Sequence, residues 1–404
     1  MDSSLSTDFV IIGLQPWDIE IGSNCKNIAL ELSKSHRVLY VNRALDRFSW
    51  IRHFRDRKVK NRLQVIRGKK DALELVSENL WVYSPPIVLE SIGWIGSRRL
   101  FDFMSRVNGN RLASVVSNTM KRLSFNNVTI LIDNDFLRGR YFKDYITKVK
   151  TVYYIRDYLT EQSYFKKHGA RYEQKIIQEV DVVLANSSYL ASYASRYNKK
   201  SFDVGQGCDL SDFIERKRLI PKNLENIKRP IIGYVGALLS SRLDISVIRY
   251  IAERNSDWSI VLVGPEDEGF QKSDLHSLPN IHFLGIAPKE QVPDYIANFD
   301  VCINPQAINP STIGNYPRKI DEYLATGKPV VATATETMNM FKEYVYLGKS
   351  AEDYIANIKK ALQEKENDRQ VEKRIKLAFS HTWQDSVEKM KKYMFSDFNK
   401  MIEV

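Results

Sequence analysis

Three charged side chains stand at the start of one short predicted helix. The stretch NYPRKIDEYLATGKPVVAT spans residues 315–333, and within it Arg318, Lys319 and Glu322 follow Pro317. Proline fits a first helical turn, where free backbone N–H groups attract anions. A basic side chain there can hold a phosphate, and a carboxylate one turn later can accept hydrogen bonds from ribose hydroxyls. The pattern predicts a nucleotide-phosphate site; the alternative is a solvated helix with an ion pair between Lys319 and Glu322.

The elements around this helix place it just after a buried strand. The apolar run DVCINP precedes it at 300–305, and PVVAT follows it at 329–333. Gly327 fits the position after the last helical residue, and Pro329 cannot continue the helix. In open α/β sheets ligands bind beyond the carboxyl ends of the strands, which is where this helix begins.

Apolar runs and helical stretches alternate along the whole chain, which indicates parallel sheets covered on both faces. In the first half the predicted strands lie at 8–14, 37–42, 79–83, 127–133, 151–157 and 181–187. In the second half they lie at 230–236, 258–264, 280–285, 300–305 and 329–333. We therefore predict an α/β fold with two Rossmann-like, doubly wound domains facing a cleft.

A chain of 404 residues is too long for one ordinary core, so two domains are expected. We predict an N-terminal domain at 1–212, a polar linker at 213–229, a C-terminal domain at 230–380 and a terminal helix at 381–404.

The composition favours an intracellular protein with an anionic partner. The net charge is +11, and the three cysteines are widely spaced, which argues against disulfides and a zinc site. Neither a signal peptide nor a run of about 20 apolar residues is recognised. No histidine spacing or acidic motif suggests a metal, so no cofactor is predicted. We expect a cytoplasmic protein, with peripheral contact to the inner face of the plasma membrane as a further possibility.

Several motifs together resemble the retaining, GT-B-fold glycosyltransferases of the group 1 type. Glu322-Tyr323-Leu324-Ala325 followed by GKPVV is similar to their C-terminal signature. VGALLSSRLD (235–244) resembles the loop that opens their C-terminal domain, and 280–305 resembles their strand, helix and strand segment. ANSSYLASYASRYNKKSFDVGQGCDLSDF (185–213) resembles the end of their first domain, and HTWQDSVEKM (381–390) resembles the helix that crosses back to it. The resemblance covers about 180–390 and is weak over 40–125.

The resemblance implies roles for particular residues. Arg242 and Lys319 would hold the diphosphate of a nucleotide sugar, and Glu322 would bind the ribose. The implied nucleotide-sugar set is Gly22, Gly236, Arg242, Gly285, Tyr316, Lys319 and Glu322. Many members carry another glutamate eight positions before Glu322, where this chain has Gly314. In those members this glutamate contacts the transferred sugar, so the sequence here does not indicate which sugar is transferred.

The first predicted domain supplies further candidates. Asp157 ends a strand and would face the sugar, so it joins Arg242 and Lys319 as a catalytic candidate; the alternative is an ion pair with Arg156. Trp17 and Asp18, before the loop of Gly22, would line the acceptor site or cap the loop.

The strongest charge bias lies at 36–70, where basic residues are interleaved with aromatic ones. Such a pattern suits an anionic membrane or a lipid diphosphate acceptor. The candidate surface residues are Arg47, Trp50, Arg52 and Arg55, and 91–104 could extend the surface. A solvated basic helix is the alternative, and no nucleic-acid motif accompanies the run.

These observations predict a hexosyltransferase-like enzyme that moves sugar from a nucleotide diphosphate sugar to a saccharide, lipid-linked or cell-envelope polysaccharide acceptor with retention. The resemblance to retaining glycosyltransferases further implies that the leaving phosphate acts as base toward the acceptor, so no protein nucleophile is required. Alternatives are a nucleotide-sugar epimerase or hydrolase of the same fold, which would need catalytic carboxylates and histidines, and a non-catalytic nucleotide- or membrane-binding protein, which would bind without turnover.

Overall fold

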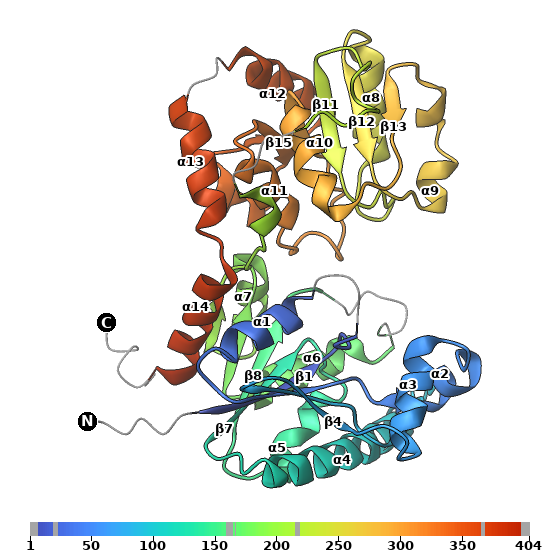
Figure 1. The fold of residues 1–404 in the computed structure, drawn as a ribbon, viewed down its shortest axis with the longest axis vertical. Coiled ribbons are helices and arrows are strands. Elements are labelled where there is room, and N and C mark those ends of the chain that lie inside the picture. Colours follow the sequence, from blue (N-terminus) through green and yellow to red (C-terminus); the bar gives the residue numbers. More distant parts are fainter. Residues whose placement is uncertain are drawn as a thin grey trace. The chain divides into compact units, whose positions relative to one another are not determined.

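The fold comes from a computed structural model that describes residues 7–18, 23–158, 165, 167–214, 219–364 and 368–396. The chain divides into two compact units (Figure 1). Unit 1 comprises Met1–Gly205 and Ser386–Val404, and unit 2 comprises Gln206–Asp385. Each unit has its own sheet and its own hydrophobic core, and each is described separately below.

Unit 1 is built on an eight-stranded sheet with the order β10-β9-β8-β7-β1-β2-β5-β4. The strands, in that order, are Ser201–Asp203, Val182–Ala185, Lys150–Ile155, Val128–Asp133, Asp8–Gly13, Val38–Val41, Leu80–Tyr83 and Leu73–Ser77. All neighbours pair parallel except β4 and β5, which are antiparallel. A separate two-stranded sheet joins β3 (Leu45–Asp46) to β6 (Val88–Leu89).

Unit 2 is built on a six-stranded, fully parallel sheet with the order β13-β12-β11-β14-β15-β16. The strands, in that order, are Ile281–Phe283, Ser259–Val263, Ile231–Val235, Val301–Asn304, Val330–Thr333 and Tyr346–Gly348. Successive residues of these strands belong to two different core clusters. Val261 and Val263 pack into one, and Ile260 and Leu262 pack into the other. The alternation follows from the two-residue period of a strand, and both faces are therefore apolar and covered.

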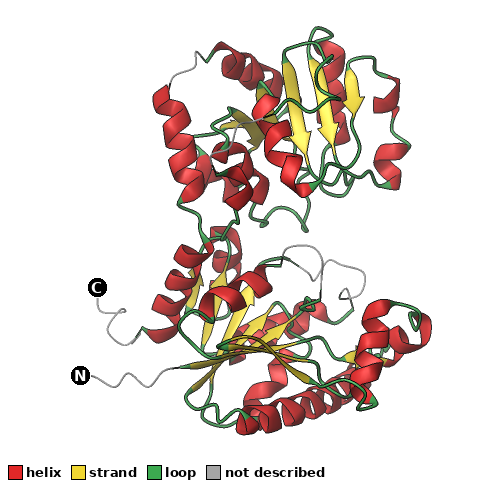
Figure 2. Ribbon diagram, viewed as in Figure 1, coloured by secondary structure: helices red, strands yellow, loops and turns green. Residues whose placement is uncertain are grey.

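The helices cover both faces of the two sheets (Figure 2). In unit 1 they are α1 (Asn24–Leu32), α2 (Arg47–Arg52), α3 (Arg57–Ile66), α4 (Arg98–Arg122), α5 (Phe142–Tyr145), α6 (Gly169–Glu179) and α7 (Ser188–Ser195). In unit 2 they are α8 (Ile245–Arg254), α9 (Glu268–Gln271), α10 (Val292–Asn298), α11 (Arg318–Ala325), α12 (Ala351–Gln363) and α13 (Asp368–Phe379).

The last helix, α14 (Trp383–Phe395), begins at the end of unit 2 and packs on unit 1. Tyr393 stacks on Phe202 with ring centroids 4.3 Å apart, and Phe395 meets Phe9 edge-on. Lys150 also donates a hydrogen bond to the carbonyl of Met394. The predicted terminal helix that crosses back to the first half of the chain is therefore confirmed.

The predicted α/β class and all eleven predicted strands are confirmed. The sequence patterns missed β3, β6, β10 and β16, which have only two or three residues each, and they also missed β4. β4 is mostly exposed, so it lacks the apolar run of a buried strand. The division between the units falls before Gln206, ahead of the predicted linker at 213–229. Leu224 is buried in the unit 2 core, and the Tyr295 hydroxyl donates to Asn223 at 2.9 Å, so part of that polar segment packs on unit 2.

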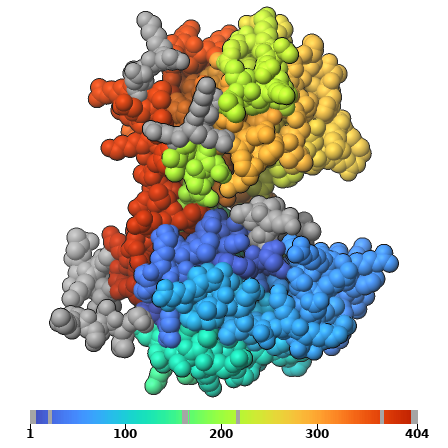
Figure 3. All heavy atoms as spheres, in the orientation of Figure 1, coloured from blue at the N-terminus to red at the C-terminus, as the bar shows by residue number. Residues whose placement is uncertain are grey.

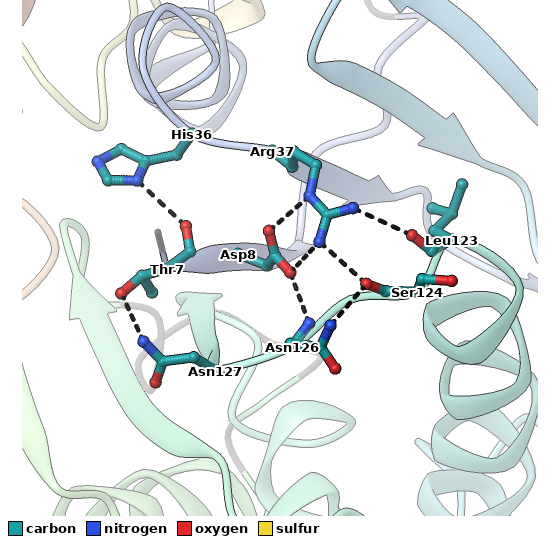
Figure 4. Close-up of polar contacts among 8 residues, drawn as sticks. All are labelled: Thr7, Asp8, His36, Arg37, Leu123, Ser124, Asn126 and Asn127. Atoms are coloured by element: carbon teal, nitrogen blue, oxygen red, sulfur yellow. Dashed lines mark hydrogen bonds and ion pairs between the residues drawn. The ribbon is translucent and has the colours of Figure 1, made fainter. Parts of the chain in front are cut away.

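An ion pair between the buried Asp8 and the partly exposed Arg37 fixes the amino-terminal edge of the unit 1 sheet (Figure 4). Arg37, before β2, donates to both carboxylate oxygens of Asp8 in β1, at 2.8 and 2.6 Å. The same guanidinium donates to the carbonyls of Leu123 and Ser124 after α4, and Asp8 accepts the backbone N–H of Asn126 at 2.6 Å. One arginine thus ties three chain segments together at the edge opposite the carboxyl ends of the strands.

A buried carboxylic acid in unit 1 should make stability depend on pH. Glu173 in α6 is fully buried and accepts hydrogen bonds from the hydroxyls of Tyr153 and Tyr193, at 3.1 and 3.2 Å. Burial raises its pKa from 4.5 to about 7, against the opposing effect of the two hydroxyls. Because the folded protein binds this proton more tightly than the unfolded chain, the group should cost stability as pH rises from 4.5 through 7.

We expect Glu173→Gln to remove this pH dependence, because glutamine resembles the protonated acid. Relative to wild type, the variant should gain about 3 kcal/mol in unfolding free energy between about pH 5 and pH 8, measured by urea titration. Glu179→Gln on the same helix is the control, since Glu179 is half-exposed and pairs with Arg140. Equal slopes for wild type and Glu173→Gln would show that Glu173 does not titrate in this range.

Candidate functional site

Two glycines bring the loops after β11 and β12 into close contact in unit 2. Gly236 and Gly264 have φ values of 144° and 150°, which side-chain-bearing residues rarely adopt. A Cβ atom on Gly264 would collide with the Gly236 carbonyl, and the Gly236 N–H donates to the Val263 carbonyl at 2.8 Å. β11 has β12 on one side and β14 on the other, so these loops lie where the strand order reverses, the usual ligand position in such sheets.

Lys319 lies directly against this glycine loop. A Cβ atom on Gly236 would overlap the Lys319 side chain, so only glycine leaves room for the lysine here. The Lys319 ammonium lies 5.6 Å from the ring centroid of Tyr234, which is buried at the end of β11. Burial raises the pKa of Tyr234, while Lys319 and Arg242 lower it, so both cations act on this hydroxyl. The structure thus places Lys319 between Gly236 and Tyr234, and Arg242 is close enough to lower the pKa of the same hydroxyl.

Arg242 is held by its backbone beside the loop after β14. Its carbonyl accepts the N–H of Ala307 at 2.9 Å, and Asp244 donates its N–H to the carbonyl of Pro305 at 2.9 Å. The Arg242 side chain is exposed, as expected for a group that would meet a solvent-borne anion. Asp244 caps α8 by accepting the N–H groups of Ser246 and Val247, which explains an aspartate at that position.

The first turn of α11 has the features predicted for an anion site. No side chain caps the helix, and Pro317 occupies the N-cap position. Glu322 is half-buried and lies 3.6 Å from Arg318, one turn earlier. The ion pair on this helix therefore joins Arg318 to Glu322, and the Lys319–Glu322 pair of the alternative interpretation does not form, because Lys319 points to Gly236 instead.

Tyr316 is buried beneath α11, and its hydroxyl is held by protein groups. It donates to Asp321 at 2.8 Å and lies 3.0 Å from Nδ1 of His381. Asp321 is fully buried and also lies 2.7 Å from Nδ1 of His381. Burial raises the pKa of Asp321, against the opposing effects of His381 and Tyr316. These contacts favour a structural role for Tyr316 over the predicted contact with the nucleotide sugar.

Gly285 and Gly22 are the remaining glycines of the predicted nucleotide-sugar set. Gly285 follows β13 with a φ of 70°, and an added Cβ would meet open space, so its conformation rather than crowding requires glycine. Its carbonyl accepts the Gly264 N–H at 2.8 Å, which joins it to the same group of loops. Gly22 lies outside the described residues.

In unit 1, Asp157 forms the ion pair that was the alternative to a role beside the sugar. Arg156 donates to Asp157 at 2.7 Å and to Asp133 at 2.9 Å. Asp133 is fully buried, whereas about a third of the Asp157 side chain is exposed. The arginine therefore positions Asp157 at the carboxyl end of the sheet, with one edge of its carboxylate toward solvent.

Trp17 and Asp18 follow β1 and lie near a pocket of about 220 Å³. Asp18 lines this pocket and pairs at 2.9 Å with the nearly buried Arg62 of α3. Trp17 packs edge-on against Tyr40, and the Lys26 ammonium lies 4.8 Å from its ring. The pocket lining mixes both charges and consists of Pro16, Asp18, Arg43, Ala44, Leu45, Asp46, Ser49, His53, Asp56, Lys58, Val59 and Arg62.

The basic surface candidates lie on α2 and the turn after it. Trp50, Arg52 and Arg55 are exposed, and Arg47 pairs with Glu90 at 2.6 Å.

Tyr234, Asp321 and His381 were missed by the sequence patterns, because a tyrosine in a strand and an isolated histidine carry no recognisable spacing. Within the described ranges no three His, Cys, Asp or Glu side chains form a group that could hold a metal ion.

The chain resembles known proteins in its fold over almost its whole length and in its sequence over part of it. The structure matches Anabaena Alr3699/HepE in complex with UDP with a TM-score of 0.62 and 14% identity, over 99% of this chain and 100% of that chain. It matches an α,α-trehalose-phosphate synthase (UDP-forming) from Burkholderia vietnamiensis with a TM-score of 0.70 and 9% identity, over 97% of both chains. The chain has the GT-B fold of these proteins, as predicted.

Residues 229–364 match the family described as "Glycosyl transferases group 1". The chain is also 30% identical over 234 residues to the "Putative teichuronic acid biosynthesis glycosyltransferase TuaH" of Bacillus subtilis (strain 168). That match spans 55% of this chain and 58% of TuaH. Residues 229–364 are therefore similar to the group 1 glycosyltransferases, as the resemblance predicted for that part of the chain.

Proposed function

We propose that the protein transfers a sugar from a nucleotide diphosphate sugar to a saccharide or lipid-linked acceptor of a cell-envelope polysaccharide, with retention at the anomeric carbon. The observation that carries the proposal is the position of Lys319 against Gly236, at the strand-order reversal of unit 2, with Arg242 in the loop that follows Gly236. The HepE structure contains UDP, and the name of TuaH refers to teichuronic acid, so UDP and an envelope acceptor are the first choices.

In this proposal the two cations neutralise the diphosphate as the bond between sugar and phosphate breaks. The start of α11 adds the positive end of the helix dipole, although the N–H groups of Arg318 and Ile320 already donate to backbone carbonyls. Glu322 accepts hydrogen bonds from the ribose. The departing phosphate takes the proton of the acceptor hydroxyl, so the protein needs no nucleophile. Asp157 would stabilise positive charge on the sugar, and the group around Trp17 and Asp18 would meet the acceptor.

The first test is a calorimetric screen against UDP, GDP, ADP, CDP and dTDP. We expect one nucleotide to bind at micromolar affinity, and we expect Glu322→Ala to weaken it at least about tenfold, equivalent to about 1.4 kcal/mol. The exposed pair Arg249→Ala and Asp274→Ala, on the surface of the same unit, serves as the control and should bind normally. A folded protein that binds none of the five would contradict the proposal.

Turnover distinguishes the proposal from its alternatives. Hydrolysis or epimerisation of the nucleotide sugar without any acceptor would favour the epimerase or hydrolase. Nucleotide binding without any release of product, across a panel of envelope saccharides and polyprenyl-linked acceptors, would favour a binding protein.

A further inference from the structure

α2 is a helix whose side chains are not buried. Phe48, Trp50, Ile51 and Phe54, on α2 and the turn after it, are 53%, 38%, 75% and 54% exposed. None of the α2 residues is buried in the described structure. A helix normally buries one apolar face, so an exposed apolar group of this size points to a partner. In Figure 1, α2 and α3 lie together beside the β4 end of the unit 1 sheet, and Figure 3 shows them as a blue block on the surface of that unit.

In the described structure, the hydrogen bonds that hold α2 to the rest of unit 1 lie at its first turn. Asp46 caps the helix by accepting the Ser49 N–H at 3.0 Å, and it also accepts the Ser91 hydroxyl at 2.8 Å. Ser91 in turn accepts the Phe48 N–H at 2.8 Å. The second turn and the residues after it make no comparable contact in the described structure, so Trp50, Ile51 and Arg52 project from a fixed base.

The charge around these apolar side chains is mostly positive. Residues 47–60 contain six basic residues and one acidic residue. Arg52, Arg55, Arg57, Lys58 and Lys60 are exposed, and within the described ranges none of them forms an ion pair. The guanidinium of Arg52 lies 5.6 Å from the Phe48 ring, and that of Arg55 lies 5.4 Å from the Phe54 ring. Cations therefore border the apolar side chains closely, the arrangement that suits an anionic bilayer surface.

We propose that α2 and the start of α3 dock on an anionic lipid bilayer, with Trp50 and Ile51 entering the interface and Arg52 and Arg55 contacting lipid phosphates. A second copy of the chain fits less well, because a two-fold contact would place this basic patch against itself. Nucleic acid also fits less well, because Ile51 is the most exposed of the four apolar residues and an aliphatic side chain does not stack on bases. The inference does not depend on the nucleotide site of unit 2.

The test is co-sedimentation of the full chain with vesicles of phosphatidylcholine, with and without phosphatidylglycerol. Two double variants are compared, Trp50→Ser with Ile51→Ser and Arg52→Glu with Arg55→Glu. The matched controls lie on unit 2, and are Leu219→Ser with Ile220→Ser for the apolar pair and Lys359→Glu with Lys360→Glu for the charge reversal. Thermal unfolding and nucleotide binding of every variant report whether both units remain folded.

We expect binding to the phosphatidylglycerol vesicles only. The apolar variant should lose at least about tenfold in partitioning, and the charge variant about thirtyfold, while both controls bind like wild type. Failure of wild type to bind the anionic vesicles would overturn the proposal. Binding that is insensitive to Trp50 and Ile51 would also overturn it, as would tight binding of a single-stranded RNA probe in place of the vesicles.

Discussion

Lys319→Ala should raise the dissociation constant of the nucleotide diphosphate at least about tenfold and lower the turnover number by about two to three orders of magnitude. The ammonium lies against the Gly236 loop, where the strand order of unit 2 reverses, and in the proposed reaction it faces charge that grows as the diphosphate departs. The loss should therefore be larger in turnover than in binding, because a developing charge interacts more strongly than the ground state.

Calorimetry with the nucleotide and product formation with the nucleotide sugar measure the two effects separately. Lys319→Arg should not restore activity. The end of the Lys319 side chain already lies against the Gly236 backbone, and the wider guanidinium of arginine has no room there. Lys342→Ala, an exposed lysine of the same unit, is the control. If Lys319→Ala bound the nucleotide as tightly as wild type, the diphosphate would have to lie elsewhere.

Asp321→Ala should destabilise unit 2 by about 3 kcal/mol. The carboxylate is fully buried and is the shared partner of Tyr316 and His381. Alanine would remove the carboxylate that Tyr316 and His381 share, in an apolar setting where Phe341 packs against both rings. Asp321→Asn should cost less, because the amide oxygen can still accept from Tyr316.

Urea unfolding gives the free energy, and hydrogen exchange of peptides from α11 locates the effect. Asp274→Ala is the matched control, since Asp274 is an exposed carboxylate paired with Arg249 on the same unit and should cost at most about 1 kcal/mol. Equal losses for the two variants would mean that the buried cluster contributes no more than a surface ion pair.

Periodicity in the sequence was sufficient for the class of fold and for the position of helix α11. The buried parallel strands are near-continuous apolar runs, so 300–305 and 329–333 could be recognised without any knowledge of their neighbours. Pro317 and Gly327 likewise carry their own backbone preferences, and α11 lies between them as predicted. Such signals are local, and they do not depend on contacts with distant parts of the chain.

Tertiary structure alone decided which side chains meet. Lys319 and Gly236 are far apart in sequence, and only the packing of α11 beside β11 shows that the lysine needs a glycine there. The same holds for Asp321, whose partner His381 is supplied by the segment before α14. It also holds for Arg156, which pairs with the buried Asp133 of the neighbouring strand as well as with Asp157. The sequence by itself determined the strands, the helix start and the basic run, because these depend on residue type and short spacing. Contacts between distant segments depend instead on the order of strands in a sheet, which no short pattern encodes.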